Sequence, residues 1–297
     1  MKRVLLTGAS GFIGLHCIEP LIARGFEVHS VSREARGDSR VTWHTGDLLK
    51  PGSVGAVIDA VKPTHLLHLA WYVVPGKLIT APENFAWVTT SFELLTRFTE
   101  AGGKRAALCG SGYEYDWTYG YCHETLTPRS PDTIYGACKN ALHEMARSYA
   151  TGKLSLVWPR VFFLYGPNEH PNRLVSSVIK SLLRGAEAPC SHGKQIRDYM
   201  HVADVAAGLV ATLDSEAEGP INVSSGEAMT LRDIVLTVGR LIGRPELIKL
   251  GALPARANDV PLVVGANARL AATGFTPRFD LEAGLADTIA WWRLQAN

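Results

Sequence analysis

The chain has 297 residues, of which 46% are hydrophobic, enough to bury the core of one large domain or of two modest ones. Its 30 basic and 28 acidic side chains are scattered, which argues against a nucleic-acid-binding tail and against a polybasic membrane anchor. No stretch reaches about 18 uninterrupted apolar residues, and the first apolar run is too short for a signal peptide, so we expect a cytoplasmic protein with no membrane partner.

Short apolar runs alternate with longer amphipathic segments through the first half of the chain. Strands are predicted at residues 3–8, 26–32, 40–46, 65–70, 105–111 and 154–160. Helices are predicted between them at residues 14–25, 83–103 and 135–152. This alternation predicts an α/β fold with a doubly wound parallel sheet that is covered by helices on both faces.

The pattern changes after about residue 160. Residues 164–173 form a loop rich in Pro, Asn and His, and residues 195–202 form a polar, strand-like run. We interpret the C-terminal part as a smaller lid on the carboxyl edge of the sheet, where such folds bind their ligands.

The first strand passes into the first helix through the sequence LLTGASGFIG, with Gly8, Gly11 and Gly14 at intervals of three. A helix N-terminus presents unpaired N–H groups and partial positive charge, and glycine lets a ligand approach closely, so the turn predicts a pyrophosphate site. The spacing is GxxGxxG and not the GxGxxG of the usual dinucleotide fingerprint. The alternative is a tight turn without a ligand.

This turn resembles the first motif of the extended short-chain dehydrogenase/reductase family, which includes nucleotide-sugar epimerases, dehydratases and ketoreductases. Residues 46–48 (GDL), 65–70 (HLLHLA), 135–139 (YGACK), 197–206 (RDYMHVADVA) and 254–261 (PARANDVP) resemble later motifs of the same family. The resemblance implies an NADP-binding Rossmann domain at 1–160, to which 196–222 returns, and a substrate-binding lid at 161–297. It implies cofactor contacts from Gly8, Ser10, Gly11, Phe12, Ile13, Gly14, Ser32, Arg33, Asp47, Leu48, Leu69, Ala70, Tyr135 and Lys139.

The end of the second predicted strand carries the signal for the cofactor. NAD-dependent enzymes commonly place an acid about 20 residues past the glycines, on the ribose 2′-hydroxyl. Here that position is Ser32, followed by Arg33, and a hydroxyl next to a guanidinium suits a 2′-phosphate. We therefore predict NADP, with NAD as the alternative; Arg33 as the start of a solvated loop is the competing interpretation.

Tyr135 and Lys139 are four residues apart and share one face of a predicted helix. A phenol with a pKa near 10 is a weak base at neutral pH, and an ammonium group about 4 Å away would lower that pKa by up to ~3 units. The resemblance implies that Tyr135 exchanges a proton with the substrate and that Lys139 tunes it and binds the nicotinamide ribose. It also implies that Ser111, four residues before Tyr115, holds the substrate oxygen.

The sugar 4,6-dehydratases of this family carry an acid two places after that serine or threonine. Here Tyr113 stands at this place and Glu114 comes one position late, so dehydration is disfavoured. Because NADP suits a net reductant, we predict a ketoreductase that acts on a nucleotide-activated 4-keto-6-deoxy sugar. The alternatives are an epimerase with tightly bound NAD, a reductase of a small non-nucleotide carbonyl compound, and a dinucleotide sensor without catalysis.

Four residues of the cleft are predicted to bind substrate. Arg197 and Arg256 lie in motifs where related enzymes place arginines on the nucleotide's phosphates, Arg173 adds to the same pocket, and Tyr113 offers a ring for stacking. For each arginine the alternative is a surface ion pair. Phe163 replaces the asparagine of the family's RxxNxYGP motif, which makes the pocket more apolar and keeps the small carbonyl substrate open.

Two further expectations concern metals and assembly. The five cysteines show neither close pairing nor metal-ligand spacing with histidine, so we expect reduced thiols and no metal site. The family resemblance implies a homodimer to which each subunit contributes two helices.

Overall fold

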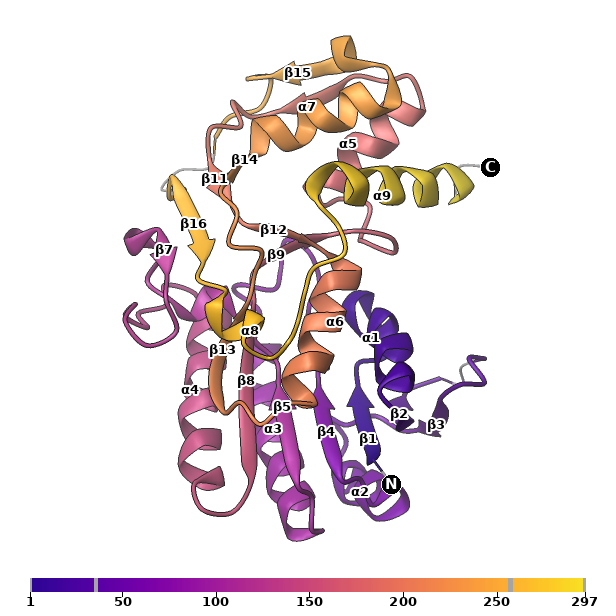
Figure 1. The fold of residues 1–297 in the computed structure, drawn as a ribbon, viewed down its shortest axis with the longest axis vertical. Coiled ribbons are helices and arrows are strands. Elements are labelled where there is room, and N and C mark those ends of the chain that lie inside the picture. Colours follow the sequence, from indigo (N-terminus) through magenta and orange to yellow (C-terminus); the bar gives the residue numbers. More distant parts are fainter. Residues whose placement is uncertain (1, 35–36, 256–258, 296–297) are drawn as a thin grey trace.

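The computed structural model describes residues 2–34, 37–255 and 259–295 (Figure 1). Within them a parallel sheet has the strand order β13–β8–β5–β4–β1–β2–β3, with β6 paired to β8 beside this path. Its strands are β1 (Lys2–Thr7), β2 (Phe26–Ser32), β3 (Thr42–Thr45), β4 (His65–His68), β5 (Arg105–Leu108), β6 (Gly110–Ser111), β8 (Ser155–Val161) and β13 (Gly219–Val223). The predicted doubly wound α/β fold is confirmed.

Helices cover both faces of this sheet because the side chains of each strand alternate between them. On β1, Val4 and Leu6 join the core beneath one helical layer, whereas Leu5 joins the core beneath the other. The first layer consists of α1 (Phe12–Ala23) and α6 (Val202–Leu213). The second layer consists of α2 (Ser53–Val61), α3 (Glu83–Glu100) and α4 (Ile134–Ala150).

A separate hydrophobic core lies beyond the carboxyl ends of the strands, at the top of Figure 1. It is built by α5 (Leu174–Leu183), α7 (Leu231–Ile242), α9 (Leu281–Gln295) and the parallel pair β10 (Ala188–Cys190) and β15 (Ile248–Leu250). The division into 1–160 and 161–297 stays a prediction, as does the return of 196–222 to the first part.

The remaining elements are short. They are η1 (Gly112–Glu114), η2 (Trp117–Tyr119), β7 (Tyr121–Cys122), β9 (Phe163–Tyr165), β11 (Ile196–Arg197), β12 (Tyr199–His201), β14 (Met229–Thr230), η3 (Pro245–Leu247), β16 (Leu262–Gly265) and α8 (Ala268–Ala271). None of the helices described in the chain is long and apolar enough to cross a membrane.

The polar run at residues 195–202 forms two short strands that belong to different sheets. β11 pairs with β14 and β16, whereas β12 pairs with β9. Asp198 stands between them, and its buried carboxylate accepts hydrogen bonds from the backbone N–H groups of Ser225, Gly226 and Gly265. These partners come from distant segments, so the break in the strand was not visible in the local sequence.

Candidate active site

The glycine turn at the start of α1 has the shape of a phosphate cradle. Gly8 has φ +76°, and a Cβ there would lie 2.8 Å from the backbone nitrogen of Ala70. A Cβ on Gly14 would lie 2.1 Å from the Gly8 carbonyl oxygen, so only glycine lets α1 begin this close to β1. Gly11 is the N-cap of α1 and brings no side chain to cap the first turn. The N–H groups of residues 12–14 therefore suit a pyrophosphate, with Ser10 exposed beside them.

The segment after β4 is fixed next to this turn. The N–H groups of Leu69 and Ala70 both lie 3.2 Å from the hydroxyl oxygen of Thr7, to which they donate. The same hydroxyl is 2.7 Å from Nδ1 of His68. Burial, aided by the charge on Lys139, lowers the pKa of His68 to about 3, so this histidine is neutral. Thr7 and His68, which no sequence pattern indicates, hold the backbone of the predicted cofactor contacts Leu69 and Ala70 in place.

The predicted adenosine-side residues lie at the carboxyl ends of β2 and β3. Ser32 is buried, and its carbonyl accepts a hydrogen bond from Gly46. Arg33 is exposed, and residues 35–36 lie outside the described residues. Asp47 accepts a hydrogen bond from the backbone of residue 49, and Leu48 packs into the core. The strand order β1–β2–β3 therefore brings these residues to the same sheet edge as the glycine turn.

Helix α4 brings Tyr135 next to Ser111. Thr133 caps the helix by accepting a hydrogen bond from the N–H of Gly136. A Cβ on Gly136 would lie 2.3 Å from the Tyr113 carbonyl oxygen, so α4 packs directly on the segment that follows Ser111. Ser111 is buried at the end of β6 and shares a hydrogen bond with the phenol of Tyr135.

Lys139 lies one helical turn beyond Tyr135 and is 4% exposed. Its ammonium group donates to the Cys109 carbonyl at 2.8 Å and lies 3.5 Å from the centre of the Trp71 ring and 6.0 Å from the centre of the Tyr135 ring. Burial lowers the pKa of Lys139 to about 8.

The predicted lowering of the Tyr135 pKa by Lys139 is wrong for this structure. Burial of the phenol raises the pKa of Tyr135, and the hydrogen bond from Ser111 opposes that rise only in part. The neutral phenol is held between the rings of Trp71, at 6.3 Å, and Tyr113, at 5.7 Å, both edge to face. Tyr135 is thus a protonated group, suited to donate a proton.

Glu114 points away from the cleft and into the core. Its carboxylate is fully buried and accepts hydrogen bonds from the N–H of Ser111 at 2.8 Å, from Trp158 Nε1 at 2.9 Å and from Arg160 Nε at 2.7 Å. Arg160 also donates to the hydroxyl of Tyr115. Glu114 therefore holds the Ser111 turn in place, and its carboxylate is occupied by these buried partners.

A row of aromatic side chains, each in contact with the next, runs from Tyr113 toward the second core. Tyr113 lies 4.4 Å from Trp117, Trp117 lies 5.8 Å from Phe163, and Phe163 stacks on Tyr199 at 5.6 Å, all between ring centres. The guanidinium of Arg197 lies 5.6 Å from the centre of the Phe163 ring. The structure thus joins Tyr113 to Tyr135 on one side and to the Arg197 region on the other.

The predicted phosphate-binding arginines differ in their surroundings. Arg197 is buried, with an ion pair of 2.5 Å to Asp259 and a hydrogen bond to the carbonyl of Ile196. Arg173 is exposed at the N-cap of α5, with its Nε 3.5 Å from the buried carboxylate of Glu169. Arg256 lies outside the described residues. A phosphate at Arg197 would compete with Asp259, whereas Arg173 is free to reach solvent.

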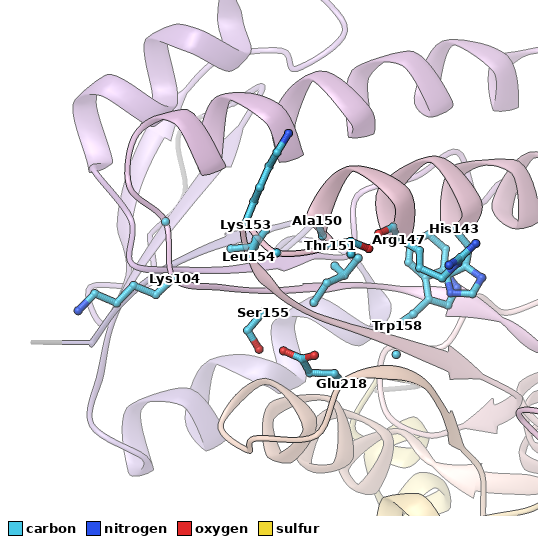
Figure 2. Close-up of a pocket in the computed structure, with 14 residues that line it drawn as sticks. Lys104, His143, Arg147, Ala150, Thr151, Lys153, Leu154, Ser155, Trp158 and Glu218 are labelled. Carbon is cyan, nitrogen blue, oxygen red and sulfur yellow. Dashed lines mark hydrogen bonds between the residues drawn. The ribbon is translucent and has the colours of Figure 1, made fainter.

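A pocket of about 860 Å³ lies apart from the candidate site residues, between the end of α4 and the starts of β8 and β13 (Figure 2). Its lining includes Lys104, His143, Trp158 and Glu218, and none of the predicted site residues. Figure 2 shows the side chains of Lys104 and Lys153 extending away from the other lining residues. Groups of three or more metal-ligating side chains are absent among the described residues.

The glycine cradle, the Tyr–Lys pair on α4 and the adjoining serine define an α/β dinucleotide-binding enzyme of the short-chain dehydrogenase type. Residues 4–224 match the model of the NAD dependent epimerase/dehydratase family, and the chain belongs to this family. The predictions of the family and of an NAD(P)-dependent oxidoreductase of the extended type are thereby confirmed.

Individual relatives span nearly the whole chain. The dTDP-6-deoxy-L-talose 4-dehydrogenase (NAD(+)) of Aggregatibacter actinomycetemcomitans is 27% identical over 89% of this chain and 99% of its own length. The UDP-glucose 4-epimerase of Thermus thermophilus in complex with NAD is 26% identical, with a TM-score of 0.83 over 98% of this chain and 99% of that chain. The UDP-glucose 4-epimerase of Thermotoga maritima shares the fold, with a TM-score of 0.88 at 22% identity over 99% and 100%.

Proposed function

We propose that this protein is a ketoreductase that uses NADP(H) to reduce the 4-keto group of a nucleotide-activated 6-deoxy sugar. The observation that carries the proposal is the buried, protonated phenol of Tyr135, hydrogen-bonded to Ser111 and followed one turn later by Lys139. Support for the substrate class comes from the name of the Aggregatibacter relative, which acts at C4 of a dTDP-6-deoxy sugar.

The residues of this chain fit the steps around a carbonyl reduction. A bound nicotinamide dinucleotide supplies the hydride. Ser111 donates a hydrogen bond to the substrate oxygen and polarises the carbonyl. Tyr135 donates the proton that this oxygen takes up, and Lys139, one helical turn further on, is placed to bind the nicotinamide ribose. The phenol is protonated at neutral pH, as a group that donates a proton to the carbonyl oxygen must be.

The choice of NADP rests on Ser32 and the exposed Arg33. Neither repels a 2′-phosphate, and the guanidinium can bind it in a bidentate manner. The Thermus epimerase is in complex with NAD and the Aggregatibacter enzyme is named for NAD(+), so NAD is the competing cofactor.

Two other functions each have one observation in their favour. An epimerase with bound NAD is favoured by the epimerase structures that match the fold over nearly the full chain. A reductase of small carbonyl compounds is favoured by Phe163, which gives the cleft an apolar ring in place of an amide.

One experiment separates these functions. The purified protein is mixed with NADPH or NADH and offered dTDP-, UDP- and CDP-4-keto-6-deoxy sugars, UDP-glucose, and simple aldehydes and ketones. We expect loss of NADPH absorbance with a 4-keto nucleotide sugar. Protein that arrives with bound NAD and epimerises UDP-glucose without net cofactor consumption would contradict the proposal, as would turnover of the simple carbonyl compounds alone.

We further propose that the protein is a homodimer joined through α3 and α4. Phe85 on α3 is 59% exposed and Met145 on α4 is 41% exposed, which leaves apolar side chains on the outer surfaces of both helices. Light scattering should give twice the chain mass of 32.2 kDa. Met145→Glu should give the monomer, whereas Leu294→Glu, at an exposed apolar residue of α9, should leave the dimer intact.

A further inference from the structure

Trp71 lies against the charged end of Lys139. It follows the cofactor-side residues Leu69 and Ala70 directly and is 8% exposed. The Lys139 ammonium group lies 3.5 Å from the centre of its ring, within the range in which a cation is attracted to the negative face of an aromatic system. Tryptophan is the strongest of the aromatic residues in this interaction.

The indole ring is fixed from its other edge. Its Nε1 donates to the side-chain oxygen of Asn84 at 2.6 Å. Asn84 is fully buried at the start of α3, and its amide nitrogen donates to the carbonyls of Leu78 and Ala81, both at 2.8 Å. Trp87 stacks alongside at 6.3 Å. The protein itself therefore fixes the indole face that is turned to Lys139.

The other groups around Lys139 do not neutralise it. Among the described residues, no carboxylate forms an ion pair with Lys139. Cys109 offers its carbonyl, and the thiols of Cys109 and Cys138 have pKa values raised by burial, so they are neutral. His68 is neutral as well, and the carboxylate of Glu114 is paired with Arg160.

We propose that Trp71 is a positioning residue that keeps the ammonium group of Lys139 charged and fixed beside Tyr135. The Trp71 ring stands where a buried lysine would otherwise have a carboxylate partner. A carboxylate would hold the lysine too, but it would place a negative charge at the site and repel a dinucleotide phosphate. The indole face attracts the cation while it carries no net charge. Trp71 thus favours the charged lysine without adding a negative charge beside it.

The test is a titration of Lys139 in the complete protein. Lysine labelled with ¹³C at Cε is incorporated, and the Lys139 resonance is assigned by its loss in Lys139→Arg. In Trp71→Leu the midpoint should fall by about one pH unit, because loss of the aromatic face favours the neutral amine. Trp291→Leu, at a half-buried ring on α9 away from Lys139, is the control and should leave the midpoint unchanged.

A second variant keeps the test valid if Trp71→Leu does not fold. Tetrafluorotryptophan placed at position 71 keeps the ring and its N–H but removes the negative face, and it should lower the midpoint in the same direction. Equal midpoints in the wild type and in whichever of these two variants folds would overturn the proposal.

The inference rests on the proposed function only for the role of Lys139 in the reaction. With an active substrate in hand, the alkaline limb of the kcat–pH profile should move to lower pH by the same amount in Trp71→Leu, because activity is lost as pH rises through the pKa of Lys139. The titration needs no substrate. If no substrate is turned over but the Lys139 midpoint shifts in Trp71→Leu, the proposed function is wrong and the role of Trp71 stands. If the enzyme is active but the midpoint does not shift, the proposed function stands and the role of Trp71 is wrong.

Discussion

Arg33 tests the choice of cofactor at the scale of a single side chain. Arg33→Ala should raise KM for NADPH by roughly tenfold to a hundredfold, since a charged hydrogen bond contributes about 1.5–3 kcal/mol. KM for NADH should stay the same, because NADH lacks the 2′-phosphate. Arg97→Ala, an exposed arginine on α3, is the matched control. An unchanged KM for NADPH would show that Arg33 is only part of a solvated loop.

The sequence predicted some residues of the site and missed others for a physical reason. Tyr135 and Lys139 were predicted together because a helix places residues four apart on one face. Trp71 has no such local signal. Its contact with Lys139 joins the end of β4 to α4, which local spacing cannot reveal. The pKa of Tyr135 was predicted in the wrong direction because its burial was unknown.

At the scale of elements, the buried ion pair between Glu114 and Arg160 links η1 to β8. Both side chains are fully buried, so Glu114→Gln leaves the charge of Arg160 without its partner and should lower the free energy of unfolding by about 3–5 kcal/mol. Glu282→Gln breaks the exposed pair with Arg240 and should leave the urea midpoint unchanged. Equal midpoints for the two variants would show that the buried pair does not stabilise the fold.

The regular elements were predictable where the pattern was local. Runs rich in Val, Leu and other apolar residues identified β1, β2, β4, β5 and β8, because parallel strands that are buried on both faces are largely apolar. The divided run at residues 195–202 was not predictable, since Asp198 receives its hydrogen bonds from segments that are distant in sequence.

At the scale of the whole molecule, buried histidines make stability depend on pH. The pKa values are lowered by burial to about 3 for His68 and about 4 for His143 and His201, so the unfolded chain takes up protons first as pH falls below 6.5. Glu169 acts in the opposite sense, because burial raises its pKa to about 7 and the folded chain keeps that proton.

Through these four groups, the unfolded chain near pH 5 binds about two more protons than the folded chain, and their contribution to stability should fall by about 3 kcal/mol per pH unit on acidification. Urea midpoints measured from pH 7 to pH 4.5 check this expectation. His192→Gln, at an exposed histidine, should leave the slope unchanged. A midpoint independent of pH over this range would mean that the buried histidines are protonated in the folded protein.

The central claim is that Tyr135 delivers the proton in a carbonyl reduction, and turnover of Tyr135→Phe measures this most directly. The variant keeps the ring between Trp71 and Tyr113, so the dissociation constant for NADPH should not change. Turnover of the 4-keto nucleotide sugar should fall by about 10²- to 10⁴-fold, the usual contribution of a general acid. A variant that binds NADPH normally and turns over at the wild-type rate would contradict the account.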